Sequence, residues 1–183
     1  GWDLSALLLE PSEALIEERL GQIEETVLTF EGLRDKLAPE MNPEILLAAV
    51  RQYEALIEQA QLIGGYGSLW FSSDTQSPDA LTFRNRMQQV FTETQNRTLF
   101  FSLWWKSLDD EQAERLLPSA AEQPDYRHYL EEMRLFKPYT LDEKSEQLIN
   151  SKDANGMNAL LTLYSMLTNR LEFDMTVDGE TKK

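Results

Sequence analysis

His128 and Glu132 come nearest, of all the residues in this sequence, to the types and spacing of a metal site. Residues four apart share one face of a helix, so the imidazole and the carboxylate could bind a metal together with a third group. However, His128 is the only histidine, whereas zinc enzymes of the H-E-x-x-H type place two on one helix face. Such a pair is also commonplace on an acidic helix. We therefore interpret His128 as a structural or surface residue and predict no metal site.

Neither the acidic residues nor the serines form a catalytic pattern. Adjacent residues do not face each other on a helix, so solvated surface is a better interpretation than acid–base pairs for Glu17-Glu18, Glu24-Glu25, Asp109-Asp110 and Glu131-Glu132. The nucleophile motifs Gly-x-Ser-x-Gly and Ser-x-x-Lys are absent. The glycines at 64, 65 and 67 lack the strand, lysine and spacing of a phosphate loop, which favours a helix break. We predict no catalytic and no cofactor-binding residue.

A group of aromatic residues allows two interpretations. These side chains could form the wall of a ligand site, or they could fill a buried core. Their spacing fits the core better. The residues concerned are Trp70, Phe100, Phe101, Trp104 and Trp105.

The composition narrows the class of partner. The chain has 183 residues, of which 42% are hydrophobic, enough for a sizeable core. Its formal charge is 17 − 32 = −15, so nucleic acid and anionic membrane surfaces are poor partners. The absence of cysteine excludes disulfides and thiolate metal sites and fits a reducing cytoplasm. The longest apolar run, Leu99–Trp105, is far shorter than a membrane span. We expect a soluble, cytoplasmic protein.

The spacing of apolar residues predicts an all-α fold in which the helices form a bundle or array. One helix is expected from about Ser12 to Leu37, because Ile16, Leu20, Ile23, Val27 and Phe30 recur at steps of four and three. A second begins at Asn42-Pro43-Glu44 and is expected to loosen or end at Gly64-Gly65, although residues 66–70 could continue it as a frayed extension. A third should run from Ser77 to about Ser107, and it is apolar nearly all round from Leu99 to Trp105. We interpret it as the central helix.

Further helix starts are expected in the second half of the chain. Asp109 with Gln112, and Thr140 with Glu143, have the spacing of capping boxes. A helix is expected from Pro124 to Phe136 because Lys137-Pro138 stops it. The last helix should run from about Asn155 to Leu171, with its apolar side chains turned inward: Leu160, Leu161, Tyr164, Met166 and Leu167.

The last eleven residues, from Phe173 to Lys183, predict a short β-hairpin fragment. Asp178-Gly179 is a strong turn signal between alternating residues, since glycine tolerates the positive φ of a two-residue turn. An isolated hairpin is marginal in water. We therefore expect the chain to be a segment of a longer protein, with a helical lobe over residues 1–171 and the start of a hairpin over 172–183 that leads to a catalytic domain.

An ordered series of phrases resembles the N-terminal region of the oligoendopeptidase F-type zinc metallopeptidases, which are relatives of thimet oligopeptidase. None of the phrases is diagnostic alone, but their order covers nearly the whole chain: Trp2-Asp-Leu-Ser5, Leu69-Trp-Phe-Ser-Ser-Asp-Thr75, Leu99-Phe-Phe-Ser-Leu103, Tyr126-Arg-His-Tyr-Leu-Glu131, Arg134, Lys137-Pro-Tyr-Thr-Leu141, Glu146, Gly156 to Leu161 and Phe173 to Gly179. Ser102 to Trp105 are less acidic than the family pattern, which is typical of a divergent subgroup.

The resemblance implies a zinc endopeptidase acting on short peptides. In that family a helical shell encloses a deep channel, two histidines and a glutamate hold zinc, and the H-E-x-x-H helix lies far downstream. This chain contains none of those positions, so the resemblance implies a non-catalytic lobe of the channel wall that is inert alone. Zinc is expected only in the full-length parent, and the implied partners are an oligopeptide substrate and the catalytic lobe of the same chain. One alternative is a stand-alone acidic helical module that binds a peptide or protein beside the central helix, and another is a purely structural helical bundle.

Overall fold

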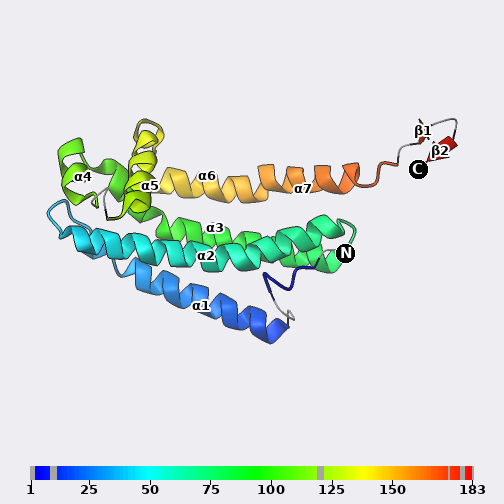
Figure 1. Cartoon of the computed structure of the whole chain (residues 1–183), viewed down its shortest axis with the longest axis horizontal. Coiled ribbons are helices and arrows are strands. Elements are labelled where there is room, and N and C mark those ends of the chain that lie inside the picture. The colour runs from blue at the N-terminus through cyan, green and yellow to red at the C-terminus, as the bar shows by residue number, and fades with distance from the viewer. Residues whose placement is uncertain (1–2, 9–11, 119–121, 173, 178–179, 183) are drawn as a thin grey trace.

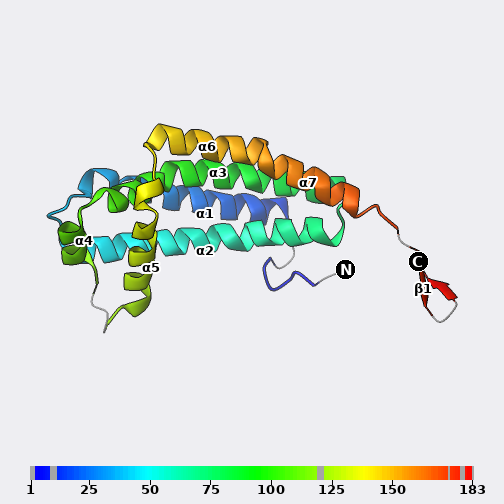
Figure 2. The same cartoon turned by 90° about the horizontal axis from the view of Figure 1, so that it is seen from above.

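The computed structural model describes residues 3–8, 12–118, 122–172, 174–177 and 180–182. Three long helices lie side by side: α1 (Glu13–Glu31), α2 (Pro43–Ser73) and α3 (Pro78–Ser107) (Figure 1). The short helices α4 (Asp110–Leu116) and α5 (Pro124–Leu135) cover one end of them, and α6 (Glu143–Asn155) and α7 (Met157–Thr168) follow one another along α3 (Figure 2). Two short 3-10 helices, η1 (Arg34–Lys36) and η2 (Lys137–Tyr139), complete the helical part. The predicted all-α class is confirmed.

Local capping signals place the starts of the long helices. Asn42 and Ser77 are the N-caps of α2 and α3, each followed by proline at the first helical position, and each side chain accepts a backbone N–H. Asp109 and Gln112 form the expected capping box at the start of α4. These predictions are confirmed because a cap depends only on residues within one turn.

The expected capping box at Thr140 is wrong. The N-cap of α6 is Asp142, whose Oδ1 accepts from the N–H groups of Lys144 and Ser145. The Thr140 hydroxyl instead donates to the carbonyl of Phe136 at 2.9 Å. Glu143 is therefore the first residue of α6 and not the third, which a capping box requires, and its carboxylate binds Arg34.

The first helix is shorter than predicted. It begins after the Ser12 cap but ends at Glu31, and η1 occupies part of the stretch that was expected to continue it. The N–H of Gly32 still bonds to the carbonyl of Leu28 at 3.4 Å. The apolar repeat itself is confirmed, since Ile16, Ile23, Val27 and Phe30 are buried.

The predicted break at Gly64-Gly65 is wrong, because α2 continues without interruption to Ser73. Packing against α3 explains why glycine is tolerated there. A Cβ at position 64 would lie 2.1 Å from Cε2 of Phe91, and one at position 67 would lie 2.9 Å from Cδ1 of Phe83. The glycines therefore let two aromatic rings of α3 approach the α2 backbone, which outweighs their weak helix propensity.

Two hydrophobic clusters fill the space between the helices. The Trp105 cluster lies toward α4 and α5 and includes Phe30, Leu46, Phe101, Trp105 and Leu130. The Ile23 cluster lies at the other end and includes Ile23, Val27, Leu56, Ile63 and Met87. Helix α3 contributes to both, so its predicted central position is confirmed. Within the described residues, no member of either cluster comes from α6 or α7.

The prediction for the last helix is wrong in both extent and orientation. Asn155 ends α6, and α7 begins at Met157 after Gly156 and ends at Thr168. The apolar residues expected inward lie at the surface: Leu160, Leu161, Tyr164 and Leu167 are exposed, and Met166 is half-buried. The apolar stripe exists as predicted, but tertiary packing turns it away from α3.

The C-terminal strands are paired as the sequence predicts. β1 (Met175–Val177) and β2 (Glu180–Lys182) are antiparallel, with Thr176 opposite Thr181. The predicted turn at Asp178-Gly179 lies outside the described residues. Both views place the strands beyond the C-terminal end of α7 (Figures 1 and 2). In the described part of the chain, no helix has the length and hydrophobicity that a membrane crossing needs.

Candidate functional site

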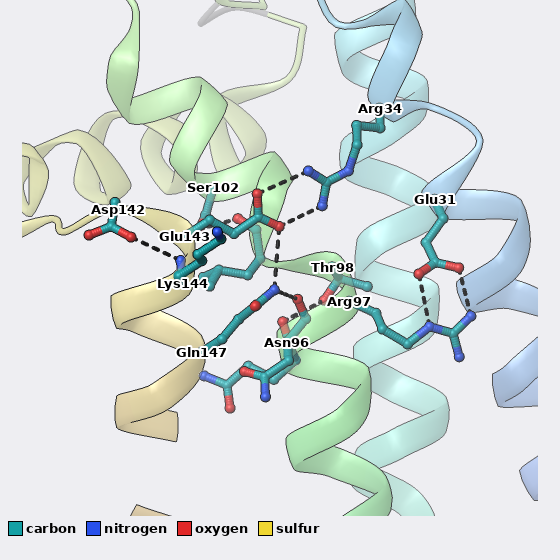
Figure 3. A network of polar contacts seen from close by, with 12 residues as sticks. Glu31, Arg34, Asn96, Arg97, Thr98, Ser102, Asp142, Glu143, Lys144 and Gln147 are labelled. Atoms are coloured by element: carbon teal, nitrogen blue, oxygen red, sulfur yellow. Dashed lines mark hydrogen bonds and ion pairs between the residues drawn. The ribbon is translucent and has the colours of Figure 1, made fainter. Parts of the chain in front are cut away.

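A network of polar side chains joins α6 to η1 and α3, and we call it the polar seam. Arg34 donates two hydrogen bonds to the Glu143 carboxylate, at 3.0 and 2.6 Å (Figure 3). The Arg34 guanidinium also lies 4.5 Å from the centre of the Phe100 ring. Bidentate geometry fixes orientation as well as distance. This pair therefore sets the position of the N-terminal end of α6.

Asn96, in the middle of α3, is the centre of the polar seam. Its side-chain oxygen accepts from Nδ2 of Asn150 at 2.9 Å, and its side-chain nitrogen donates to Oγ of Ser151 at 3.4 Å. The Asn96 carbonyl accepts from Nε2 of Gln147 at 3.1 Å, and Gln147 also reaches Glu143 (Figure 3). Asn96 alone therefore bonds to three residues on the inner side of α6: Gln147, Asn150 and Ser151.

Arg97 faces the other way and joins α3 to α1. Its Nε and Nη2 donate to the Glu31 carboxylate at 2.9 and 2.6 Å (Figure 3). Its Nη1 donates to Glu24 at 2.6 Å. The hydrogen bonds from Arg97 hold the pKa of Glu31 below its ordinary value of 4.5, and those from Arg34 lower the pKa of Glu143 in the same way. Both carboxylates are therefore bound as anions.

Replacing Glu31 by a neutral residue should lower the free energy of unfolding only at pH values where the Glu31 carboxylate is ionised. The folded-state pKa of Glu31 is lowered, so its contribution is complete above about pH 4.5 and is lost as pH falls through the folded value. We expect Glu31→Gln to lower the free energy of unfolding by up to about 1 kcal/mol at pH 7, because the pair is partly exposed and screened. Urea unfolding at pH 7 and below pH 4 measures the difference.

Glu25→Gln is the matched control for this prediction. It removes the same charge from the same helix, and the Glu25 side chain is exposed. We expect a smaller effect of this variant at pH 7. A loss for Glu31→Gln that persists undiminished at acidic pH would contradict the role of the ion pair.

Helix α7 is anchored by polar contacts at its middle and just after its C-terminal end. Nη1 of Arg84 donates to the Thr162 hydroxyl at 2.6 Å, and Nδ2 of Asn169 donates to the Thr75 hydroxyl at 2.8 Å. Arg170 donates to Oε1 of Gln76, also at 2.8 Å. These contacts join α7 and the residues after it to α3 and to the turn between α2 and α3.

Two open clefts flank the polar seam. The first, of about 620 Å³, is lined by Phe100, Trp104, Lys106 and Lys137 together with the Arg34–Glu143 pair. The second, of about 700 Å³, lies between α3 and the helices α6 and α7. It is lined mainly by polar residues, including Asn85, Gln88 and Asn158. Both clefts can accept hydrogen-bonding ligands. Polar contacts of this kind can bind and orient a ligand or a neighbouring element.

The structure brings His128 and Glu132 together, but it leaves both side chains at the surface. His128 and Glu132 are both exposed, with 3.5 Å between Nε2 and Oε1. Among the described residues, no three His, Cys, Asp or Glu side chains lie together in a metal-binding arrangement. The adjacent acids Glu24 and Glu25, by contrast, point in different directions: Glu24 binds Arg97, whereas Glu25 is exposed.

The aromatic residues lie in the core, as the sequence favoured. Phe100, Phe101 and Trp105 belong to the Trp105 cluster, and Trp104 packs against it, whereas Trp70 packs against the Ile23 cluster. The set is therefore divided between two clusters and forms no single wall. Trp104 and Phe100 also border the first cleft, which gives them some access to a ligand.

Sequence reasoning missed the polar seam entirely. Arg34 and Glu143 lie 109 residues apart, and Asn96 and Asn150 lie 54 apart, so no local spacing relates them. The only sequence signal for the polar seam was the excess of amide and hydroxyl side chains on α6, and a solvated surface explains that excess equally well. The polar seam depends on the tertiary fold.

Comparison with known proteins gives two matches. Residues 104–173 match the sequence family described as Oligopeptidase F. The fold is similar to the crystal structure of oligoendopeptidase-F from Enterococcus faecium, with a TM-score of 0.71 and 19% sequence identity. The match covers 93% of this chain and 34% of that one, so this chain spans about a third of the length of the protein it matches. No curated protein sequence matches significantly. The resemblance inferred from the ordered phrases is confirmed.

Proposed function

We propose, from the likeness of this chain to the N-terminal region of oligoendopeptidase F, that it is the non-catalytic N-terminal lobe of a zinc-dependent oligoendopeptidase. Residues 1–171 are the helical lobe, and residues 172–183 lead into the catalytic part of the same chain. The lobe forms part of the wall of a substrate channel in a cytoplasmic enzyme that hydrolyses short peptides.

The observation that carries this proposal is the extent of the fold match. It runs over 93% of the chain, and the family match at residues 104–173 lies within it. Because likeness at 19% identity indicates fold rather than chemistry, zinc and proteolysis come from the family resemblance. The absence of an H-E-x-x-H motif from this sequence agrees with a lobe whose catalytic residues lie elsewhere.

The lobe contributes to function through shape and movement. A wall of long packed helices restricts a channel by size and admits unfolded peptides. Its rigidity comes from the two hydrophobic clusters that join α1, α2 and α3. Movement of such a lobe against the catalytic part would open and close the channel.

The test compares the isolated chain with the full-length parent. We expect the parent to cleave oligopeptides, to lose this activity with a chelator, and to regain it with zinc. We expect the isolated chain to be inert with zinc added. Reading the parent gene beyond Lys183 should reveal H-E-x-x-H several hundred residues on. Chelator-sensitive cleavage by the isolated chain, or a parent without that motif, would refute the proposal.

The second cleft favours the alternative function, that of a stand-alone helical module that binds peptides. Amide groups can bond both the N–H and the C=O of an extended peptide, and Asn85, Gln88 and Asn158 line this cleft beside α3. Calorimetric titration of the isolated chain with oligopeptides discriminates the two functions. Binding that Gln88→Ala and Asn158→Ala abolish supports the module, whereas no binding supports a lobe that acts only within its parent.

A further inference from the structure

Helix α7 carries an apolar face that points away from the rest of the protein, and we call it the outer face. Its residues recur at steps of three and four, so they form one stripe. The exposed fraction is 63% for Leu160, 67% for Tyr164 and 56% for Leu167. The outer face comprises Met157, Leu160, Leu161, Tyr164 and Leu167 of α7 and Leu171 just after it, whereas Leu163 borders the second cleft.

The outer face is unusual for an amphipathic helix. Such a helix normally turns its apolar stripe toward the core, but Thr162 on the opposite side of α7 bonds to Arg84 of α3. Both hydrophobic clusters are formed by residues before α6, and neither α6 nor α7 contains a buried residue. Contiguous exposed apolar surface of this kind marks an interaction site.

The chemistry of α7 narrows the type of partner. Met157–Thr168 contains no charged residue, in a chain whose net charge is −15. A cationic ligand would find no carboxylate on this helix to pair with. The outer face therefore fits an apolar protein surface, where burial of aliphatic and aromatic side chains supplies the stabilisation.

The comparison indicates where that surface comes from. The matched oligoendopeptidase chain is about three times as long, and the match covers 93% of this chain, so the additional length lies mainly outside the matched region. The paired strands after α7 lie beyond its C-terminal end, which carries the polypeptide past the end of the outer face (Figures 1 and 2).

We propose that the part of the parent chain that follows Lys183 packs on the outer face of α7. This proposal rests on the proposed function, and it names the surface through which the lobe is joined to the catalytic part. Helix α7 then lies between two bodies: the hydrogen bond from Arg84 to Thr162 holds its inner side to α3, and apolar contacts hold its outer face to the catalytic part.

The experiment measures the exposure of Tyr164 by hydroxyl-radical labelling with mass spectrometry. Tyr164 should be labelled in the isolated chain and should lose that labelling in the full-length parent. Tyr139, which is 80% exposed on η2, is the internal control and should be labelled in both. Equal labelling of Tyr164 in a parent that cleaves peptides would overturn this inference while leaving the proposed function intact. A parent without peptidase activity refutes the proposed function instead.

A matched pair of variants tests the same surface by stability. Leu160→Asp should lower the thermal midpoint of the parent but not that of the isolated chain, because only the parent covers the outer face. Leu28→Asp, on an exposed leucine of α1, should affect both proteins equally. If the isolated chain forms a dimer that Leu160→Asp dissociates, a second copy covers the outer face and the proposal is wrong.

Discussion

Trp105→Ala should lower the free energy of unfolding by about 3–5 kcal/mol, the largest effect expected of any single substitution in this chain. Trp105 is completely buried in the Trp105 cluster, so truncation leaves a cavity that the surrounding helices cannot close. Its Nε1 donates to the carbonyl of Leu130 at 2.8 Å, and its own carbonyl accepts from Arg134 at 3.0 Å. Chemical unfolding monitored by far-UV circular dichroism measures the loss.

Two variants separate the contributions at this position. Trp105→Phe keeps most of the apolar contact and loses the indole hydrogen bond, so we expect a much smaller loss than for alanine. Trp104→Ala changes the adjacent residue, which is only half-buried, and should also cost less. Equal losses for Trp104→Ala and Trp105→Ala would show that burial at the junction of α3 and α5 does not determine stability.

Gly64→Ala and Gly65→Ala should change stability in opposite directions. A methyl group at position 64 would lie 2.1 Å from the Phe91 ring, and overpacking costs about 1–3 kcal/mol, which outweighs the gain in helix propensity. At position 65 no atom lies within 4 Å of the added Cβ. Gly65→Ala should therefore stabilise α2 by up to about 1 kcal/mol.

Thermal unfolding of both variants, followed by circular dichroism, compares them directly. Because the two positions are adjacent in one helix, they share the same unfolded-state effect of replacing glycine. A shift of the midpoint in the same direction for both would contradict the close approach of Phe91 to the α2 backbone.

The helix starts could be predicted because their causes are local. Asn42-Pro43 and Ser77-Pro78 combine a capping side chain with a proline whose φ suits the first turn, and both helices begin there. The central position of α3 could also be predicted, since a segment that is apolar nearly all round requires neighbours on several sides. Every residue from Leu99 to Trp105 is buried or half-buried.

Apart from the Asp142 cap of α6, which is local, the main features that the sequence did not predict depend on tertiary contacts. Glycine normally weakens a helix, and only the Phe83 and Phe91 rings explain why α2 continues through residues 64–67. The apolar stripe of α7 was identified, but periodicity shows only which residues share one face of a helix. It does not show which part of the protein that face contacts. The polar seam, the nearest feature to a functional site, likewise joins residues too distant in sequence for any pattern to relate.

The order of the clusters along the chain bears on how the protein is made. Among the described residues, all members of the Trp105 and Ile23 clusters, with the half-buried side chains packed on them, lie at or before Met133. During translation, therefore, the ribosome synthesises these cluster residues before it synthesises α6. The nascent N-terminal helices can fold early, while the leucines of α7 emerge later and must be protected until a covering surface has itself been translated.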